Sequence, residues 1–291
     1  MRRVIPVLLL ALVAASCSSD SSDGASTASA ANATTTTTEP ATGGEPFAIV
    51  ASSDLAVGEN RFLIGFRDFD GTLLGSPSES LELTVHPDGQ PDATQTVDGS
   101  FLWIVPDLTG LYRAELDFEV TGTWMVDAKL GGRDIPTASF TVRPEPQAAA
   151  IGQAGPPSVT PTGSNSALKD ITSDPSPDPR FYRLSVDEAL QSGMPNVIIF
   201  ATPAFCNSQA CGPMVDQMKV LADSRPEVNW VHVEVYENIQ DPANLTFVPA
   251  ITEWGLPTEP WLFVTDANGI VRARFEGVVD PVEVVEALDQ L

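Results

Sequence analysis

The stretch VIIFATPAFCNSQACGPMVDQMKVLADS, residues 197–224, decides the fold of the C-terminal half of the chain. It opens with four consecutive apolar residues, which is typical of a strand buried on both faces of a sheet. Cys206 and Cys211 follow, and from Pro213 onward apolar residues recur at helical spacing. We therefore expect a buried strand, a loop that carries both cysteines, and a helix.

The segments around this stretch alternate between helix and strand patterns. Ser185 and Glu188 form a capping box at the start of a short helix. Further strands are expected at 230–235, 261–264 and 270–275, and a last helix at 281–291. The resulting order, α-β-α-β-(helix or loop)-β-β-α, predicts an α/β domain over residues 179–291.

Several short motifs in this domain match one family. The sequence CGP at 211–213 is similar to the first three residues of the Cys-Gly-Pro-Cys active site of thioredoxins. Glu-Pro at 259–260 lies where that family has its cis-proline, and DANG at 266–269 matches the turn between its last two strands. Over residues 181–291 the chain therefore resembles the thioredoxin superfamily.

The resemblance implies a thioredoxin-like fold and thiol–disulfide exchange, with Cys206 and Cys211 as the catalytic pair. It also implies a substrate groove that is formed by Gly212, Pro213 and Pro260. No cofactor and no metal are expected. The expected partners are exported proteins with thiols or disulfides, or a membrane redox partner.

The sequence departs from thioredoxins at Met214, which replaces the second cysteine of the family motif. The second thiol lies upstream, at Cys206. Residues five apart in a continuous helix point about 140° apart, so the two cysteines can form a disulfide only if 206–210 is a loop or an unwound turn. If a helix begins near Cys211, its dipole favours the thiolate there.

Three other functions remain open. Residues 202–212 are similar to the active-site segment of bacterioferritin-comigratory (PrxQ-type) peroxiredoxins, which implies peroxide attack by Cys206 and resolution by Cys211. In a copper-handling protein, His232 is the candidate third ligand. The main alternative is a non-catalytic surface binding or scaffold protein, in which the disulfide is structural and contributes about 2 kcal/mol.

Residues 46–143 carry a different pattern. Apolar residues alternate with polar ones in six short runs separated by turn signals, which predicts an all-β sandwich of immunoglobulin type. The segments TGLY at 109–112 and GTW at 122–124 are weakly similar to FixH-like domains. We expect Trp103 and Trp124 in the core, and no metal site at His86.

The N-terminus has the layout of a secretory signal peptide, with two arginines, an apolar run too short to span a membrane, and small residues before Cys17. This arrangement resembles the lipobox of bacterial lipoproteins, which implies that residues 1–16 are removed and that Cys17 is lipidated. The alternative is an ordinary signal peptide with an incidental cysteine. The resemblance places the protein on the extracytoplasmic face of the cell membrane, anchored by lipid.

Two further segments are read from composition. Residues 17–45 are rich in Ser, Thr and Ala and predict a disordered tether, and the proline-rich residues 144–178 predict a stiff, extended linker. The net charge of −24 disfavours nucleic acid as a partner. With Cys17 lipidated, Cys206 and Cys211 are an even pair, which is normally oxidised outside the cytoplasm.

Overall fold

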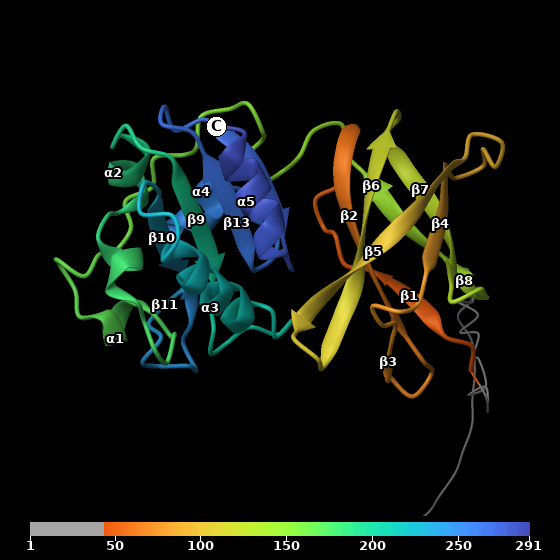
Figure 1. Ribbon diagram of the computed structural model, residues 1–291, viewed down its shortest axis with the longest axis horizontal. Coiled ribbons are helices and arrows are strands. Elements are labelled where there is room, and N and C mark those ends of the chain that lie inside the picture. Colours follow the sequence, from red (N-terminus) through yellow and green to blue (C-terminus); the bar gives the residue numbers. More distant parts are fainter. Residues whose placement is uncertain (1–43) are drawn as a thin grey trace, which may run out of the picture. The chain divides into compact units, whose positions relative to one another are not determined.

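A computed structural model describes residues 44–291 (Figure 1). The predicted signal peptide 1–16, nearly all of the predicted tether and the predicted lipidation site Cys17 lie outside these described residues, so they remain predictions. In the described part of the chain, no helix is long and apolar enough to cross a bilayer.

Residues 47–142 fold into an all-β unit, as the alternating pattern predicts. Its strands are β1 (Phe47–Val50), β2 (Gly58–Arg67), β3 (Leu73–Leu74), β4 (Leu81–Pro87), β5 (Gln95–Val105), β6 (Thr109–Phe118), β7 (Gly122–Leu130) and β8 (Arg133–Val142). In β4, every second residue from Leu81 to Pro87 is buried and the intervening ones are more exposed. This alternation places one face of each strand in a shared apolar core.

The strands form two packed sheets that share the long strand β5. The first half of β5 pairs with β4, and its second half pairs with β6. The strand order is β1-β2-β6-β5 in one sheet and β5-β4-β7-β8 in the other. This is the order of the two sheets of an immunoglobulin-type sandwich, so the predicted β-sandwich is confirmed.

The two tryptophans that we expected in the core of the sandwich differ in how deeply they are buried. Trp124 is buried, and its ring contacts Phe118 edge-on at 4.9 Å between centroids. Trp103 is only half-buried, because it lies near the hairpin end of β5, where the pairing register shifts before Val105. The expectation for Trp103 is therefore corrected.

The proline-rich segment 144–178 has irregular backbone apart from the short helix α1 (Leu168–Ile171). It also packs on the C-terminal unit. The Gly152 amide donates to the Val271 carbonyl at 2.8 Å, and the Val271 amide donates to the Gln153 carbonyl at 2.9 Å. The buried polar side chains of this segment are those of Ser158, Thr160, Thr162, Thr172 and Asp174. The segment is thus part of the C-terminal unit rather than an extended connection through solvent.

The C-terminal unit contains a four-stranded sheet covered by helices. Its elements are the 3₁₀ helix η1 (Pro179–Tyr182), α2 (Val186–Leu190), β9 (Asn196–Ala201), α3 (Cys211–Ala222), β10 (Asn229–Glu234), β11 (Tyr236–Glu237), β12 (Thr246–Phe247), α4 (Pro249–Glu253), β13 (Trp261–Thr265), β14 (Val271–Glu276) and α5 (Pro281–Asp289). The capping box at Ser185 is present, since the Glu188 carboxylate accepts from the Ser185 amide.

The order of the main sheet is β10-β9-β13-β14. Strand β9 runs parallel to β10 and antiparallel to β13, and β13 runs antiparallel to β14. All six residues of β9 are buried, as its apolar run predicts. Alternate residues of β9 belong to different cores: one face packs against α3 and α5, and the other packs against α2 and α4. The cysteine loop begins where this central strand ends.

Candidate functional site

A disulfide joins Cys206 and Cys211 at the end of β9. The residues between them are not helical, as the spacing required, and the two Cα atoms lie 6.0 Å apart. Cys211 is the first residue of α3 and is fully buried, whereas Cys206 is partly exposed. The Cys206 sulfur lies 3.2 Å from the Ser208 hydroxyl. A thiol from solvent therefore has access to the side of Cys206.

The residues predicted for the substrate groove lie at the same end of the sheet. Gly212 and Pro213 form the first turn of α3, and a Cβ atom added to Gly212 meets no neighbour within 4 Å. The Glu259–Pro260 peptide bond is cis. Trp261 pairs with Phe200 in the sheet, and extending this antiparallel register by one residue brings Pro260 beside the end of β9.

Three aromatic side chains form a series of ring contacts that begins at the residue before Cys206. We call Phe205, Tyr236 and Phe247 the aromatic patch. Phe205 directly precedes Cys206, and its ring centroid lies 6.3 Å from that of Tyr236. Tyr236 stacks on Phe247 across the β11–β12 hairpin at 5.1 Å, and Phe247 is 58% exposed. The patch offers an apolar surface beside the accessible sulfur.

A carboxyl group borders the aromatic patch. Glu259 is half-buried, and burial raises the pKa of its carboxyl group. Burial also raises the pKa of the Tyr236 hydroxyl, and the negative charges of Glu259 and Glu234 raise it further. The surroundings of the patch are therefore acidic and disfavour an anionic ligand.

A buried hydrogen-bond network holds the end of β9, just before the cysteine loop. His232 Nε2 lies 3.0 Å from the Ala201 carbonyl oxygen, and Nδ1 lies 2.7 Å from the Tyr182 hydroxyl. Burial lowers the pKa of His232, against the opposing charge of Glu234, so the ring is neutral. Since a carbonyl only accepts, Nε2 carries the proton and Nδ1 accepts from Tyr182.

A second pair of hydrogen bonds, made by Ser173, reaches the cysteine loop. The Ser173 amide donates to Glu234 at 2.7 Å, and the Ser173 hydroxyl accepts from the Ala204 amide at 3.1 Å. Both ring nitrogens of His232 are occupied, so the ring has no free lone pair for copper. Among residues 44–291, no group of three His, Cys, Asp or Glu side chains is placed to hold a metal ion. His86 contacts its neighbouring carbonyl, that of Pro87, at 2.9 Å.

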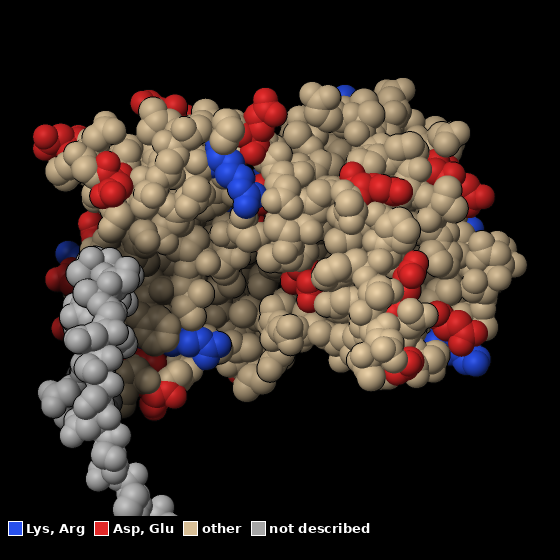
Figure 2. Space-filling view, turned by 180° about the vertical axis from the view of Figure 1, so that it is seen from behind, with Lys and Arg blue, Asp and Glu red and all other residues tan. Residues whose placement is uncertain are grey.

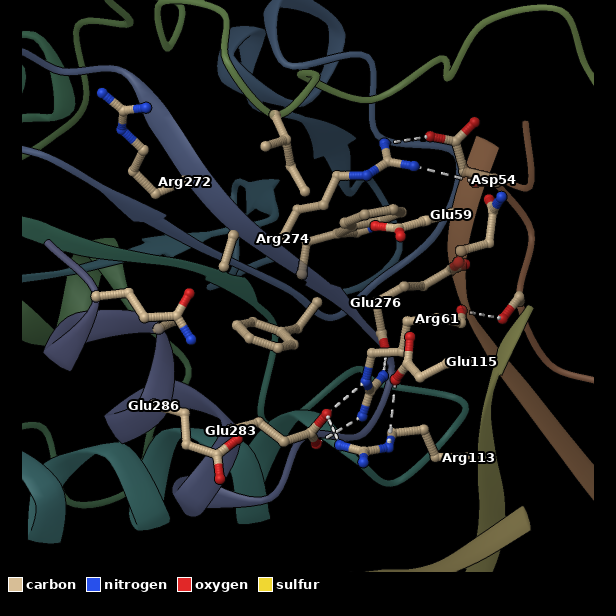
Figure 3. A pocket seen from close by; sticks show the side chains of 18 of the residues that line it. Asp54, Glu59, Arg61, Arg113, Glu115, Arg272, Arg274, Glu276, Glu283 and Glu286 are labelled. Atoms are coloured by element: carbon tan, nitrogen blue, oxygen red, sulfur yellow. Dashed lines mark hydrogen bonds and ion pairs between the residues drawn. The ribbon is translucent and has the colours of Figure 1, made fainter. Parts of the chain in front are cut away.

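A cleft of about 750 Å³ lies between β2 and β6 of the sandwich and β14 and α5 of the C-terminal unit (Figure 3). At one side, Glu283 accepts from Arg61 at 2.8 and 2.9 Å and from Arg113 at 2.6 Å. Burial raises the pKa of Glu283, but hydrogen bonds and charge from Arg61, together with Arg113, outweigh it and leave the pKa lowered.

At the other side of the cleft, the fully buried Asp54 carboxylate accepts from Arg274 at 2.8 Å (Figure 3). It also accepts from the backbone amides of Gln147 and Ala148, at 2.7 and 2.9 Å. The arginines that line the cleft are paired with carboxylates; they are Arg61, Arg113, Arg272 and Arg274. The cleft is thus an ion-paired contact between the two units.

The charged side chains on one face of the molecule are mostly acidic. Figure 2 shows carboxylates scattered over one face, where basic side chains are few and do not gather into a patch. This distribution agrees with the net charge of −24. A basic surface that could follow a nucleic acid backbone is not seen on this face.

Neither a protein-family model nor a curated protein matches the sequence. Two solved structures are similar to part of it. One is the crystal structure of the Lin-41 filamin domain, with 17% identity, 34% of this chain and 92% of that chain covered, and a TM-score of 0.23. The other is the Pseudomonas fluorescens alkylpurine DNA glycosylase AlkC bound to DNA containing an abasic site analog, with 10% identity, 34% and 30% covered, and a TM-score of 0.21. At these TM-scores neither similarity indicates a shared fold or function.

The sequence identified the two cysteines as site residues, but it did not identify the residues that surround them in space. Tyr236 and Phe247 are isolated aromatic residues in the sequence, and only the β11–β12 hairpin brings them to Phe205. The ion pairs of Asp54 and Glu283 join residues far apart in the chain, and no local pattern signals them. Phe205, directly before Cys206, was the one local signal of an apolar surface at the site.

Proposed function

We propose that this protein is a membrane-anchored, extracytoplasmic thiol–disulfide exchange protein with a thioredoxin-like C-terminal domain. The sheet order supports the fold assignment. Its first two strands are parallel and joined by α3, and the next two form an antiparallel pair followed by α5. This β-α-β unit followed by a β-β-α unit is the arrangement expected from the thioredoxin resemblance, with the cysteines between the central strand and the next helix.

The observation that carries the proposal is the difference between the two sulfur positions. Cys206 is partly exposed, and Cys211 is buried at the start of a twelve-residue helix. An incoming thiolate reaches Cys206, and the displaced Cys211 thiolate forms at the helix N-terminus, where the helix dipole stabilises negative charge. We assign Cys206 as the cysteine that bonds to the substrate in the mixed disulfide, and Cys211 as the resolving cysteine.

The exchange has two steps. A substrate thiolate bonds to the Cys206 sulfur, the Cys206–Cys211 bond breaks, and Cys211 leaves with the electron pair and takes up a proton. A second substrate thiolate then attacks the substrate sulfur of the mixed disulfide, and Cys206 leaves as a thiolate. The substrate dithiol is oxidised to a disulfide, and the protein pair gains two electrons. The reverse sequence reduces a substrate disulfide.

The substrates that fit this site are polypeptides. The aromatic patch lies beside Cys206, and its exposed ring, Phe247, is available to an apolar side chain near a substrate cysteine. An exported protein that is still folding presents such side chains. Attachment to the membrane through Cys17 places the site where exported proteins emerge.

The reduction potential of the Cys206–Cys211 pair tests the proposal. The purified soluble region is equilibrated against glutathione, and the oxidised fraction is measured. A potential between about −270 and −120 mV, the range of known exchange proteins, is the expected result. A potential below about −300 mV contradicts the exchange function.

The alternative function is a non-catalytic binding or scaffold protein with a structural disulfide. The full burial of Cys211 favours it, because buried disulfides resist reduction. This alternative predicts that the disulfide survives millimolar glutathione in the folded protein and that surface binding is the same in a Cys206→Ser, Cys211→Ser variant. Peroxidase activity stays a third possibility, and Glu259 opposes it because a carboxylate there disfavours a nearby thiolate.

A further inference from the structure

The cysteine loop is in contact with the β-sandwich. Ala210, the residue before Cys211, is 4% exposed and packs in a small apolar cluster with Leu63, Leu102 and Leu111 of the sandwich. We call these three leucines the loop pocket. In Figure 1 the chain before α3 lies beside β5 and β6. The contact buries Ala210, whereas Cys206 is partly exposed.

The loop pocket is on the outer face of its sheet. The neighbouring residues Phe62 and Ile64 belong to the sandwich core, and Leu63, between them, points to the opposite face. The outer face of an antiparallel sheet is ordinarily polar. The buried leucines on this face are therefore accounted for by the C-terminal unit that packs on them, including Ala210.

The loop is also conformationally constrained. Gln209 has a backbone φ of 61°, in the left-handed region, which is unfavourable for a residue with a side chain. It lies inside the disulfide-closed ring, between Cys206 and the docked Ala210. When the disulfide is reduced, the ring opens, and the pocket is then the remaining constraint on this strained residue.

We propose that the loop pocket of the β-sandwich sets the redox equilibrium of the disulfide. It binds the disulfide-closed conformation of the loop more tightly than the open one, and so makes the pair harder to reduce. By linkage, oxidation of the pair strengthens the contact with the sandwich to the same degree. This regulation rests on the proposed function and gives the sandwich a role in it.

The equilibrium with glutathione measures this effect. One glutathione thiolate bonds to Cys206 and displaces Cys211, which takes up a proton. A second glutathione thiolate attacks the bound glutathione sulfur, so that Cys206 is released and glutathione disulfide forms. Two electrons pass from two glutathione molecules to the protein pair, and the equilibrium constant is read from the oxidised fraction.

The sandwich-side test is Leu111→Ala, with Leu73→Ala as the matched control. Leu111 lines the pocket, whereas Leu73 is a partly exposed leucine of the same unit, 40% exposed on β3. We expect Leu111→Ala to raise the equilibrium constant for reduction about tenfold and Leu73→Ala to change it less than twofold. Urea unfolding confirms that both variants are folded under the conditions of the measurement.

The loop-side test keeps the proposal falsifiable if Leu111→Ala fails to fold. Ala210→Asp places a charge in the pocket, and Gln209→Glu places the same charge one residue away, at an exposed position. We expect a rise of at least tenfold for Ala210→Asp and less than twofold for Gln209→Glu.

Two outcomes contradict the inference. Equal equilibrium constants in the pocket variants and their controls show that the pocket binds both forms alike. A decrease in the pocket variants shows that it favours the reduced form. Either result leaves the exchange function standing, because that function depends on the wild-type potential. Conversely, a wild-type potential below about −300 mV contradicts the exchange function but leaves the variant comparison valid.

Discussion

Arg61 on β2 forms a two-point ion pair with Glu283 on α5, with Nε–Oε1 and Nη2–Oε2 distances of 2.8 and 2.9 Å. Arg113 adds a third contact to the same carboxylate. The side chains of Arg61 and Glu283 are 12% and 8% exposed. The link between the sandwich and the C-terminal unit therefore depends on a charge that is largely removed from water.

Replacement of Glu283 by glutamine tests that link. Glu283→Gln keeps the shape of the side chain but leaves two arginines without their carboxylate. Removing one partner of a buried pair costs about 3–5 kcal/mol, and partial solvent access of Arg113 reduces this to about 2–3 kcal/mol. Urea unfolding measures the loss. Glu286→Gln, an exposed position on the same helix, is the control and should stay within about 0.5 kcal/mol of wild type.

The Glu283 carboxylate also makes the free energy of unfolding depend on pH. The pKa of folded Glu283 lies below its ordinary value of 4.5. Its contribution to the free energy of unfolding is complete above pH 4.5 and is lost as the pH falls through the lowered pKa. We expect wild type to lose stability between pH 5 and 3 faster than Glu283→Gln, as measured by urea unfolding at each pH. Parallel curves for the two proteins contradict this assignment. Glu115 acts in the opposite sense, because burial and, to a lesser degree, the charge of Glu283 raise its pKa in wild type.

Tyr182 connects the buried histidine to the start of the C-terminal unit. Its hydroxyl lies 2.7 Å from His232 Nδ1 and 3.0 Å from the Thr172 hydroxyl. Tyr182→Phe leaves Nδ1 buried without a partner, which costs about 1–2 kcal/mol in the free energy of unfolding. Tyr236→Phe, at a partly exposed site, should change it by less than about 0.5 kcal/mol. Equal effects of the two substitutions indicate that the network does not stabilise the fold.

The local pattern of the sequence predicted the helices and strands well, but it predicted the contacts between them poorly. The apolar run at β9, the cysteine loop and the helix from Cys211 follow from residues that are adjacent in the chain. The apolar cluster that contains Ala210 and the sandwich leucines joins two units, and alanine on a loop gives no signal of burial. Glu283 also caps the start of its own helix, since its carboxylate accepts from the Asp280 amide.

Composition also misled at residues 144–178. Proline, glycine and serine are frequent in linkers, and the segment has the irregular backbone that they predict. Its backbone amides and carbonyls pair with those of the loop and strand near β14, and five of its polar side chains are buried. Hydrogen bonds of the main chain do not depend on residue type, so composition cannot reveal them.

Substitution of Gly212 tests whether this glycine is needed for the fold or for the substrate groove. A Cβ atom at this position meets open space, and the residue lies in the first turn of α3, so Gly212→Ala should raise the free energy of unfolding by about 0.5–1 kcal/mol. If the predicted substrate groove passes over Gly212, the added methyl group slows exchange with a protein substrate and leaves reduction by dithiothreitol unchanged. A stable variant with unchanged rates for both reductants removes Gly212 from the groove.

The last prediction concerns the aromatic patch. Phe247 is 58% exposed and stacks on Tyr236, whose ring contacts Phe205 directly before Cys206, so its removal costs little stability but deletes the exposed ring of the patch. We expect Phe247→Ser to lower kcat/KM about tenfold for exchange with a peptide that carries leucine or phenylalanine next to its cysteine, since burying such a side chain contributes about 1.5 kcal/mol. The rate with glutathione, which lacks an apolar side chain, should change less than twofold.

Phe69→Ser removes an equally exposed phenylalanine, 61% exposed in a turn of the sandwich, and should alter neither rate. A loss of rate with both peptide and glutathione in Phe247→Ser indicates that the substitution disturbs the disulfide itself, and unchanged rates with both show that substrates do not contact the patch.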